Sequence, residues 1–87
     1  MLFRSARDGI RINAVCPTDT DTPMMLDDFR QRGVSVEQGS RESAAAIPMG
    51  RMAEAHEVAE VVCFLASGAA SFLTGVALPI DGGTTAG

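Results

Sequence analysis

The 87-residue sequence has no lysine, no tyrosine and no tryptophan, and it has a single histidine and two cysteines. All seven basic residues are therefore arginines, scattered along a chain whose net charge is −4. This charge argues against a protein that binds the phosphate backbone of a nucleic acid. No apolar run approaches the length of a membrane span. The few histidine and cysteine side chains also argue against a metal site.

Cys16 and Cys63 both lie in apolar runs, which predicts two buried, reduced thiols in a cytoplasmic protein. The start of the sequence lacks the long apolar stretch that is typical of a secretory leader. Apolar residues make up 46% of the chain, a share typical of a globular protein and not of a disordered one. From its length we expect one domain at most.

The stretch from Ile10 to Pro23 is the centre of the sequence. Residues 10–16 alternate and then become apolar, which predicts a strand buried on both faces of a parallel sheet. Pro17 ends this strand, and the threonines and aspartates of residues 18–22 predict a compact polar loop. Thr22-Pro23 is typical of a helix N-cap and first helical position. A buried strand therefore ends beside a helix start, where open α/β sheets bind ligands.

Residue spacing predicts the elements on the C-terminal side. The clearest is a helix over Glu54–Ser67, whose apolar face repeats at helical spacing with Val58, Val61, Val62 and Leu65. Residues 76–80 alternate as a second strand, and Pro79 within it favours a position at the sheet edge. The turn after it is assigned to Asp81-Gly82-Gly83. Residues 1–9 are expected as the tail of a helix and residues 84–87 as a frayed end.

A short helix is expected from Pro23 to about Arg32, followed by a polar, mobile segment over residues 33–43 with a helical turn around 37–46. The apolar face of the short helix consists of Met24, Met25, Leu26 and Phe29. This face has two interpretations, a stripe that packs on the core or a lid over a pocket. Its position directly after the strand end, and the adaptability of methionine, favour the lid.

Four motifs resemble, in order and spacing, the C-terminal third of the short-chain dehydrogenase/reductase family. They are Ile10-Arg11-Ile12-Asn13-Ala14-Val15-Cys16-Pro17 followed by Thr22, Ile47-Pro48-Met49-Gly50-Arg51, Phe64-Leu65-Ala66-Ser67, and Thr74-Gly75 leading to Ile80-Asp81-Gly82-Gly83. Thr18 departs from the family, which usually has glycine there, and Ala55 stands at a usual proline. If position 18 requires a positive φ, a threonine there is strained.

The resemblance implies an α/β fold, the C-terminal part of a Rossmann-like doubly wound parallel sheet. Residues 1–87 would be a C-terminal fragment of a single NAD(P)-binding domain, with two strands, a helical lid insert at about 23–46 and one long helix. The implied parent enzyme is a cytoplasmic homo-oligomer, a dimer or tetramer. It would transfer a hydride between NAD or NADP and a small alcohol or ketone. The substrate, the choice of NAD or NADP and the direction of reaction stay open.

The resemblance also implies site residues. Pro17, Thr18 and Thr20 would border the nicotinamide ring, with backbone groups near Thr20 bonding its carboxamide. The Thr22 hydroxyl would meet the carboxamide or the pyrophosphate. From the residues alone, Thr22 is a helix cap, and one hydroxyl can serve both roles in different states.

No catalytic residue is assigned within the chain. The family uses a tyrosine and a lysine, which this sequence lacks, and it has no glycine-rich loop between a strand and a helix. The chain alone is therefore expected to be inactive. The alternatives are a truncated, non-enzymatic interaction module and a nonfunctional remnant.

Three titratable residues receive plain structural interpretations. Asp19 and Asp21 suggest a carboxylate pair or a metal loop, but without partners at ligand spacing they are interpreted as solvated turn residues. His56 lies near a helix start between acidic neighbours and is interpreted as an exposed surface residue.

Overall fold

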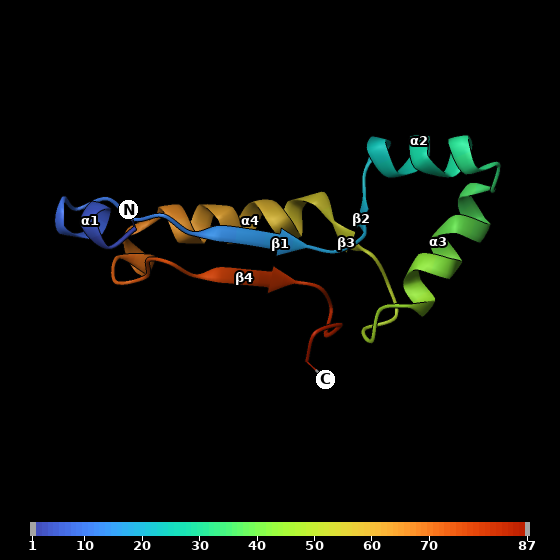
Figure 1. The fold of residues 1–87 in the computed structure, drawn as a ribbon. Coiled ribbons are helices and arrows are strands. Elements are labelled where there is room, and N and C mark those ends of the chain that lie inside the picture. Colours follow the sequence, from blue (N-terminus) through green and yellow to red (C-terminus); the bar gives the residue numbers. More distant parts are fainter. Residues whose placement is uncertain (1, 87) are drawn as a thin grey trace.

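The structure is a computed structural model that describes residues 2–86. Met1 and Gly87, at the ends of the expected helix tail and frayed terminus, lie outside the described residues. The elements run in the order α1 (Leu2–Arg7), β1 (Ala14–Pro17), β2 (Thr20–Asp21), α2 (Pro23–Arg32), α3 (Val36–Ala45), β3 (Ala53–Glu54), α4 (Ala55–Ala66), the 3₁₀ helix η1 (Gly68–Ala70) and β4 (Ala77–Ile80). Helices and strands are interspersed along the chain and the strands pair in parallel, as expected for the α/β class (Figure 1).

Two short parallel ladders organise the strands. β1 pairs with β4 from Ala14↔Ala77 to Pro17↔Ile80, and α4 lies along this pair (Figure 1). A second ladder joins β2 to β3 through Thr20↔Ala53 and Asp21↔Glu54. Within residues 2–86, β4 has β1 as its only strand neighbour, which agrees with the edge position expected from Pro79.

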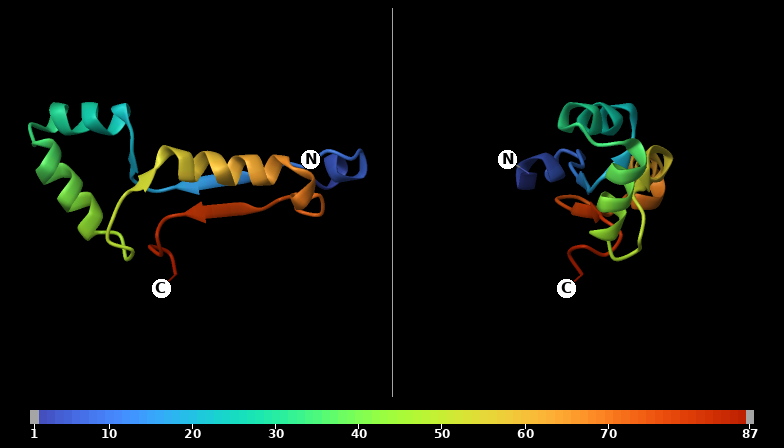
Figure 2. Two further views of the ribbon diagram at one scale, coloured as in Figure 1. Left: turned by 180° about the vertical axis from the view of Figure 1, so that it is seen from behind. Right: turned by 90° about the vertical axis from the view of Figure 1, so that its right-hand side faces the viewer.

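The helices α2 and α3 form an arm that stands beyond the carboxyl end of β1 (Figures 1 and 2). Phe29 of α2 is 1% exposed, and a Cβ built on Gly39 of α3 would lie 2.5 Å from its ring. The polar segment expected to be mobile is therefore a regular helix for most of its length. Ser35 caps it by accepting a hydrogen bond from Gln38 N at 3.1 Å, and Gly39 lets it approach the phenyl ring.

The strand expected over residues 10–16 begins only at Ala14, which corrects that boundary. Side chains hold the chain before it. Asn13 Oδ1 accepts from Val76 N at 3.0 Å, and Arg11 Nη1 donates to the Leu65 carbonyl near the end of α4 at 2.9 Å. An arginine at a helix C-terminus satisfies free carbonyls and suits the helix dipole. Before Ala14 these side-chain contacts accompany a backbone hydrogen bond from Gly75 N to the Ile12 carbonyl at 2.8 Å.

The prediction that the strand and both cysteines are buried was wrong for the chain as it stands. Cys16 and Cys63 are exposed, and Ile12 is 50% exposed. On α4, Leu65 is buried but Val62 is 47% exposed. The reason is geometric, because within residues 2–86 only α4 packs along the β1–β4 pair (Figure 2). None of the helices in this part of the chain combines the length and apolar character that crossing a bilayer requires.

The contact between Gly39 and Phe29 predicts the sign of a mutation. Alanine is the better helix former by about 1 kcal/mol, so propensity alone predicts that Gly39→Ala stabilises α3. The clash with the Phe29 ring predicts the opposite, a loss of about 1–3 kcal/mol in the free energy of unfolding. Urea unfolding of the chain measures this difference.

Gly68→Ala is the matched control for that experiment. A Cβ on Gly68 meets no described atom within 4 Å, and its φ is not in the left-handed region. We expect its free energy of unfolding to stay within about 0.5 kcal/mol of the original chain. A stabilised Gly39→Ala variant would contradict the packing of α3 on α2.

Candidate functional site

An open groove of about 810 Å³ lies where β1 ends and α2 begins. Its walls come from the loop after β1, the first two turns of α2 and the start of α4: Pro17, Thr18, Asp19, Thr20, Thr22, Met24, Met25, Asp28, Ala55 and Val58. The groove thus brings together all four residues that the sequence placed near a nicotinamide ring. It also includes two of the four residues assigned to the lid.

Backbone hydrogen bonds hold the loop after β1 from two sides. Thr18 N donates to the Ile80 carbonyl at 3.1 Å, which extends the β1–β4 ladder, and Ala53 N donates to the Asp19 carbonyl at 3.2 Å. Within the loop, Thr20 Oγ1 donates to the Thr18 carbonyl at 2.9 Å. In the described part of the chain no residue other than glycine has a positive φ. Thr18 at the family's usual glycine is therefore not strained.

Thr22 is the N-cap of α2, as the sequence predicts. Its backbone is extended, with φ −142° and ψ 163°, and Pro23 follows at the first helical position. The Thr22 Oγ1 accepts a hydrogen bond from Met25 N at 3.3 Å. A hydroxyl can accept and donate at once, so Thr22, which lines the groove, can still donate to a ligand there.

The four apolar residues of α2 divide between two surroundings. Met24 is 81% exposed and lines the groove together with Met25. Phe29 instead packs against Gly39 of α3, and neither it nor Leu26 lines the groove. The helix therefore has both a core contact and a groove contact, so each interpretation of the stripe describes part of it. The lid role itself stays a prediction.

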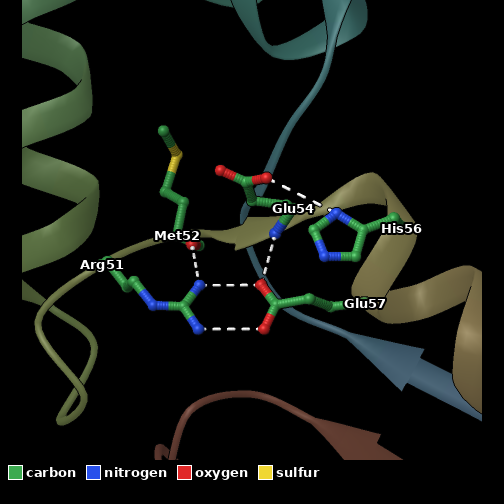
Figure 3. A network of polar contacts seen from close by, with 5 residues as sticks. All are labelled: Arg51, Met52, Glu54, His56 and Glu57. Atoms are coloured by element: carbon green, nitrogen blue, oxygen red, sulfur yellow. Dashed lines mark hydrogen bonds and ion pairs between the residues drawn. The ribbon is translucent and has the colours of Figure 1, made fainter.

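An ion-pair network fixes the start of α4 (Figure 3). Arg51 contacts Glu57 through two hydrogen bonds, Nη1 to Oε1 at 2.7 Å and Nη2 to Oε2 at 2.9 Å. Glu57 Oε1 also accepts from Glu54 N at 2.9 Å, so this carboxylate caps the helix while it binds the arginine. Because Ala55 and Val58 are groove residues, the network holds one wall of the groove.

The same contacts shift proton affinities. Hydrogen bonds from Arg51, and then from the Glu54 N–H, lower the pKa of Glu57 to about 2. The pair raises the pKa of Arg51. His56 lies outside the groove, with its side chain 64% exposed and Nδ1 3.5 Å from Glu54 Oε2, as expected for a surface residue (Figure 3).

The turn after β4 lies at Asp81-Gly82-Gly83, as the sequence predicts. The carboxylate of Asp81 holds this turn. Asp81 Oδ2 accepts from Thr85 Oγ1 at 2.6 Å and Oδ1 accepts from Gly83 N at 3.0 Å. These hydrogen bonds lower the pKa of Asp81, and the bond from the Thr85 hydroxyl has the largest effect. Gly82 and Gly83 have positive φ angles of 58° and 101°, which glycine adopts readily and other residues rarely do.

Sequence reasoning missed four residues of the groove: Asp19, Asp28, Ala55 and Val58. Asp19 was interpreted as a solvated turn residue, but it is only partly exposed and lines the groove. Ala55 and Val58 reach the groove because the β2–β3 ladder places the start of α4 beside the loop. Strands of two residues leave no periodic signal in a sequence, so this approach was not predictable.

Residues 3–85 match the family model described as enoyl-(acyl carrier protein) reductase. The chain belongs to the short-chain dehydrogenase/reductase family, and its parallel strands match the fold of that family. The short-chain dehydrogenase srdC of Neurospora crassa is 44% identical over an alignment of 84 residues that covers 93% of this chain and 28% of that protein. The 4-formylbenzenesulfonate dehydrogenase TsaC1/TsaC2 of Comamonas testosteroni is 49% identical over 79 residues, or 90% of this chain and 30% of that protein.

Solved structures show the same arrangement. A short-chain dehydrogenase family protein from Francisella tularensis superposes with a TM-score of 0.86 at 34% identity, covering 99% of this chain and 37% of that one. The 3-ketoacyl-(acyl-carrier-protein) reductase of Brucella melitensis, solved with NADH, gives 0.79 at 34% identity, covering 97% and 30%. The chain therefore matches a Rossmann-like fold of this family while spanning about a third of the length of such relatives.

The Arg51–Glu57 pair predicts an unusual titration. The Glu57 carboxyl should stay ionised as the solution is acidified below its ordinary pKa of 4.5 and take up a proton only near about 2. Since the folded pKa is the lower one, the stabilisation from this carboxylate is fully present above the ordinary value and is lost as the pH falls through the folded one. NMR of the Glu57 side-chain carboxyl carbon measures the pKa of this group in the folded chain.

Arg51→Gln should move the pKa of Glu57 upward, because it removes the first cause of the shift. Arg30→Gln is the control, since Arg30 pairs with Asp27 on the exposed face of α2 at 3.4 Å. An unchanged Glu57 titration in the Arg51 variant would show that the two-bond contact does not form in solution.

Proposed function

We propose that the chain is the C-terminal part of a single NAD(P)-binding Rossmann-like domain, with a substrate lid at about residues 23–46. In the complete enzyme this domain transfers a hydride between NAD or NADP and a small alcohol or ketone. The carrying observation is that Pro17, Thr18, Thr20 and Thr22 line one groove at the carboxyl end of a parallel strand. A cytoplasmic homo-oligomer, dimer or tetramer, is part of this proposal.

The groove has the chemistry that a nicotinamide ring requires. Its volume of about 810 Å³ lies in the range of small-molecule sites. Pro17, Met24 and Val58 offer apolar surface for a flat ring, and the threonines offer hydroxyl groups for its carboxamide. The backbone that carries these hydroxyls is tied to two ladders, so the polar groups are held before any ligand arrives.

Each residue has a role in binding and orientation. Pro17, Thr18 and Thr20 border the ring, and the Thr22 hydroxyl donates to the carboxamide or pyrophosphate while it caps α2. Met24 and Met25 cover the groove as the lid, and Leu26 and Phe29 belong to the same helix, which Phe29 anchors to α3. The bound nicotinamide supplies the hydride chemistry. The sequence has no tyrosine or lysine, the pair that the family uses for proton transfer, and we assign that role to no residue of the chain.

A second candidate is a non-enzymatic interaction module. Phe72 is 100% exposed, and Val62 and Phe64 of α4 are 47% and 45% exposed. Within residues 2–86, β1 has a single strand neighbour and so keeps one open edge. Apolar side chains and an open strand edge are features that take up a partner. Nucleotide binding in the groove separates the two candidates, because the module requires none.

The proposed cofactor site predicts where NADH perturbs the amide signals of the isotope-labelled chain in NMR. Thr18, Thr20, Thr22 and Ala55 should shift with added NADH. The amides of Arg11 and Val62, which line a separate hollow at the far end of β1, should not. Shifts at Arg11 and Val62 with none in the groove would contradict the assignment.

The role of the Thr22 hydroxyl predicts a second difference. Thr22→Ala removes one hydrogen bond to the ligand and should weaken NADH binding about fivefold, whereas Thr22→Ser keeps the hydroxyl and the affinity. Ser35→Ala is the matched control, because Ser35 caps α3 in the same way but does not line the groove. Loss of either cap costs about 1 kcal/mol in the free energy of unfolding. If Thr22→Ala and Ser35→Ala weaken NADH binding equally, Thr22 acts only as a helix cap and its proposed contact with the ligand is contradicted.

A further inference from the structure

We propose that Asp19 sets the charge preference of the groove and makes it bind the oxidised, cationic nicotinamide ring more tightly than the reduced, neutral ring. This inference rests on the proposed function and adds a residue that discriminates between the two states of the cofactor. Three observations carry it: the place of Asp19 in the groove, the absence of a partner for its carboxylate, and the other charges around it.

Asp19 lies between two threonines on the loop that closes the end of β1. It lines the groove, and its backbone carbonyl is fixed by the hydrogen bond from Ala53 N at 3.2 Å. Its side-chain carboxylate, in contrast, has no hydrogen bond or ion pair with any of residues 2–86. A partly exposed, unpaired carboxylate therefore stands in a wall that otherwise consists of hydroxyl and apolar groups and Asp28.

The nearest charges do not neutralise Asp19. Asp28 also lines the groove, but its Oδ2 accepts from Arg32 Nε at 2.9 Å, so that pair carries no net charge. Arg32 shares a neighbouring hollow with Asp19 and Glu42, and its guanidinium lies 5.4 Å from the centre of the Phe29 ring. No ion pair joins Arg32 to Asp19 in the described residues. The net charge of the groove wall is therefore that of Asp19.

A negative wall interacts differently with the two states of nicotinamide. The oxidised ring carries a positive charge and the reduced ring carries none, while the ribose and phosphate are the same. Opposite charges about 4 Å apart attract by about 1 kcal/mol even at the dielectric constant of water. That energy corresponds to a preference of about fivefold for the oxidised ring.

Oxidised and reduced nicotinamide mononucleotide test this inference, because they differ in ring charge and share the phosphate. NMR titration of the 87-residue chain gives both dissociation constants and shows from the shifted amides whether each ligand occupies the groove. We expect Asp19→Asn to reduce the preference for the oxidised form about fivefold relative to the original chain. Asparagine keeps the size of the side chain, and the amide spectrum checks the fold.

Asp21→Asn is the matched control, since it removes the same charge two residues away. Asp21 lines a different hollow, with Ser40 and Met52, and should leave the preference unchanged. If both ligands bind in the groove and Asp19→Asn leaves their ratio unchanged, the inference fails while the proposed function stands. If neither ligand shifts the groove amides, both fail. If Asp21→Asn lowers the preference for the oxidised ligand as much as Asp19→Asn does, the preference comes from the overall charge of the chain and the inference is overturned.

Discussion

Two backbone hydrogen bonds on either side of one loop control the geometry of the whole candidate site. Thr18 N to the Ile80 carbonyl ties the loop to the β1–β4 ladder, and Ala53 N to the Asp19 carbonyl ties it to β3. Backbone bonds of this kind fix direction as well as position, because the strands on both sides must be parallel. Thr18 and Thr20 therefore line the groove through the geometry of the ladders, whereas Thr22 is placed by its own N-cap hydrogen bond.

The second ladder also explains why a distant helix belongs to the site. β3 leads directly into α4, so pairing of β2 with β3 brings Ala55 beside the threonine loop. Glu57 then completes the junction by capping the Glu54 N–H and binding Arg51 (Figure 3). The groove thus has one wall fixed by backbone bonds and one by an ion pair. The methionines of α2 line it from an arm in which Phe29 packs against Gly39.

The sequence predicts what short-range chemistry decides. The cap at Thr22, the bounds of α2 and the turn at residues 81–83 follow from residue types and spacing, and the structure confirms them. The helix predicted over Glu54–Ser67 is also present, one residue shorter at each end. It does not predict what long-range contacts decide. Asn13 and Arg11 make side-chain bonds to the turn before β4 and to the end of α4, and β1 begins only after them, at Ala14. Cys16 and Cys63 look buried by their neighbours in sequence, but burial depends on what packs against them.

Thermal unfolding of the 87-residue chain, followed by circular dichroism with and without NADH and NADPH, tests the central claim most directly. We expect a cooperative transition whose midpoint rises with nucleotide, by several degrees at about ten times the dissociation constant. Such a rise would mean that the two ladders form in this chain and present a working nicotinamide wall. A cooperative transition that neither nucleotide moves would contradict the cofactor site. The absence of any cooperative transition would contradict the claim that these ladders hold the loop in place.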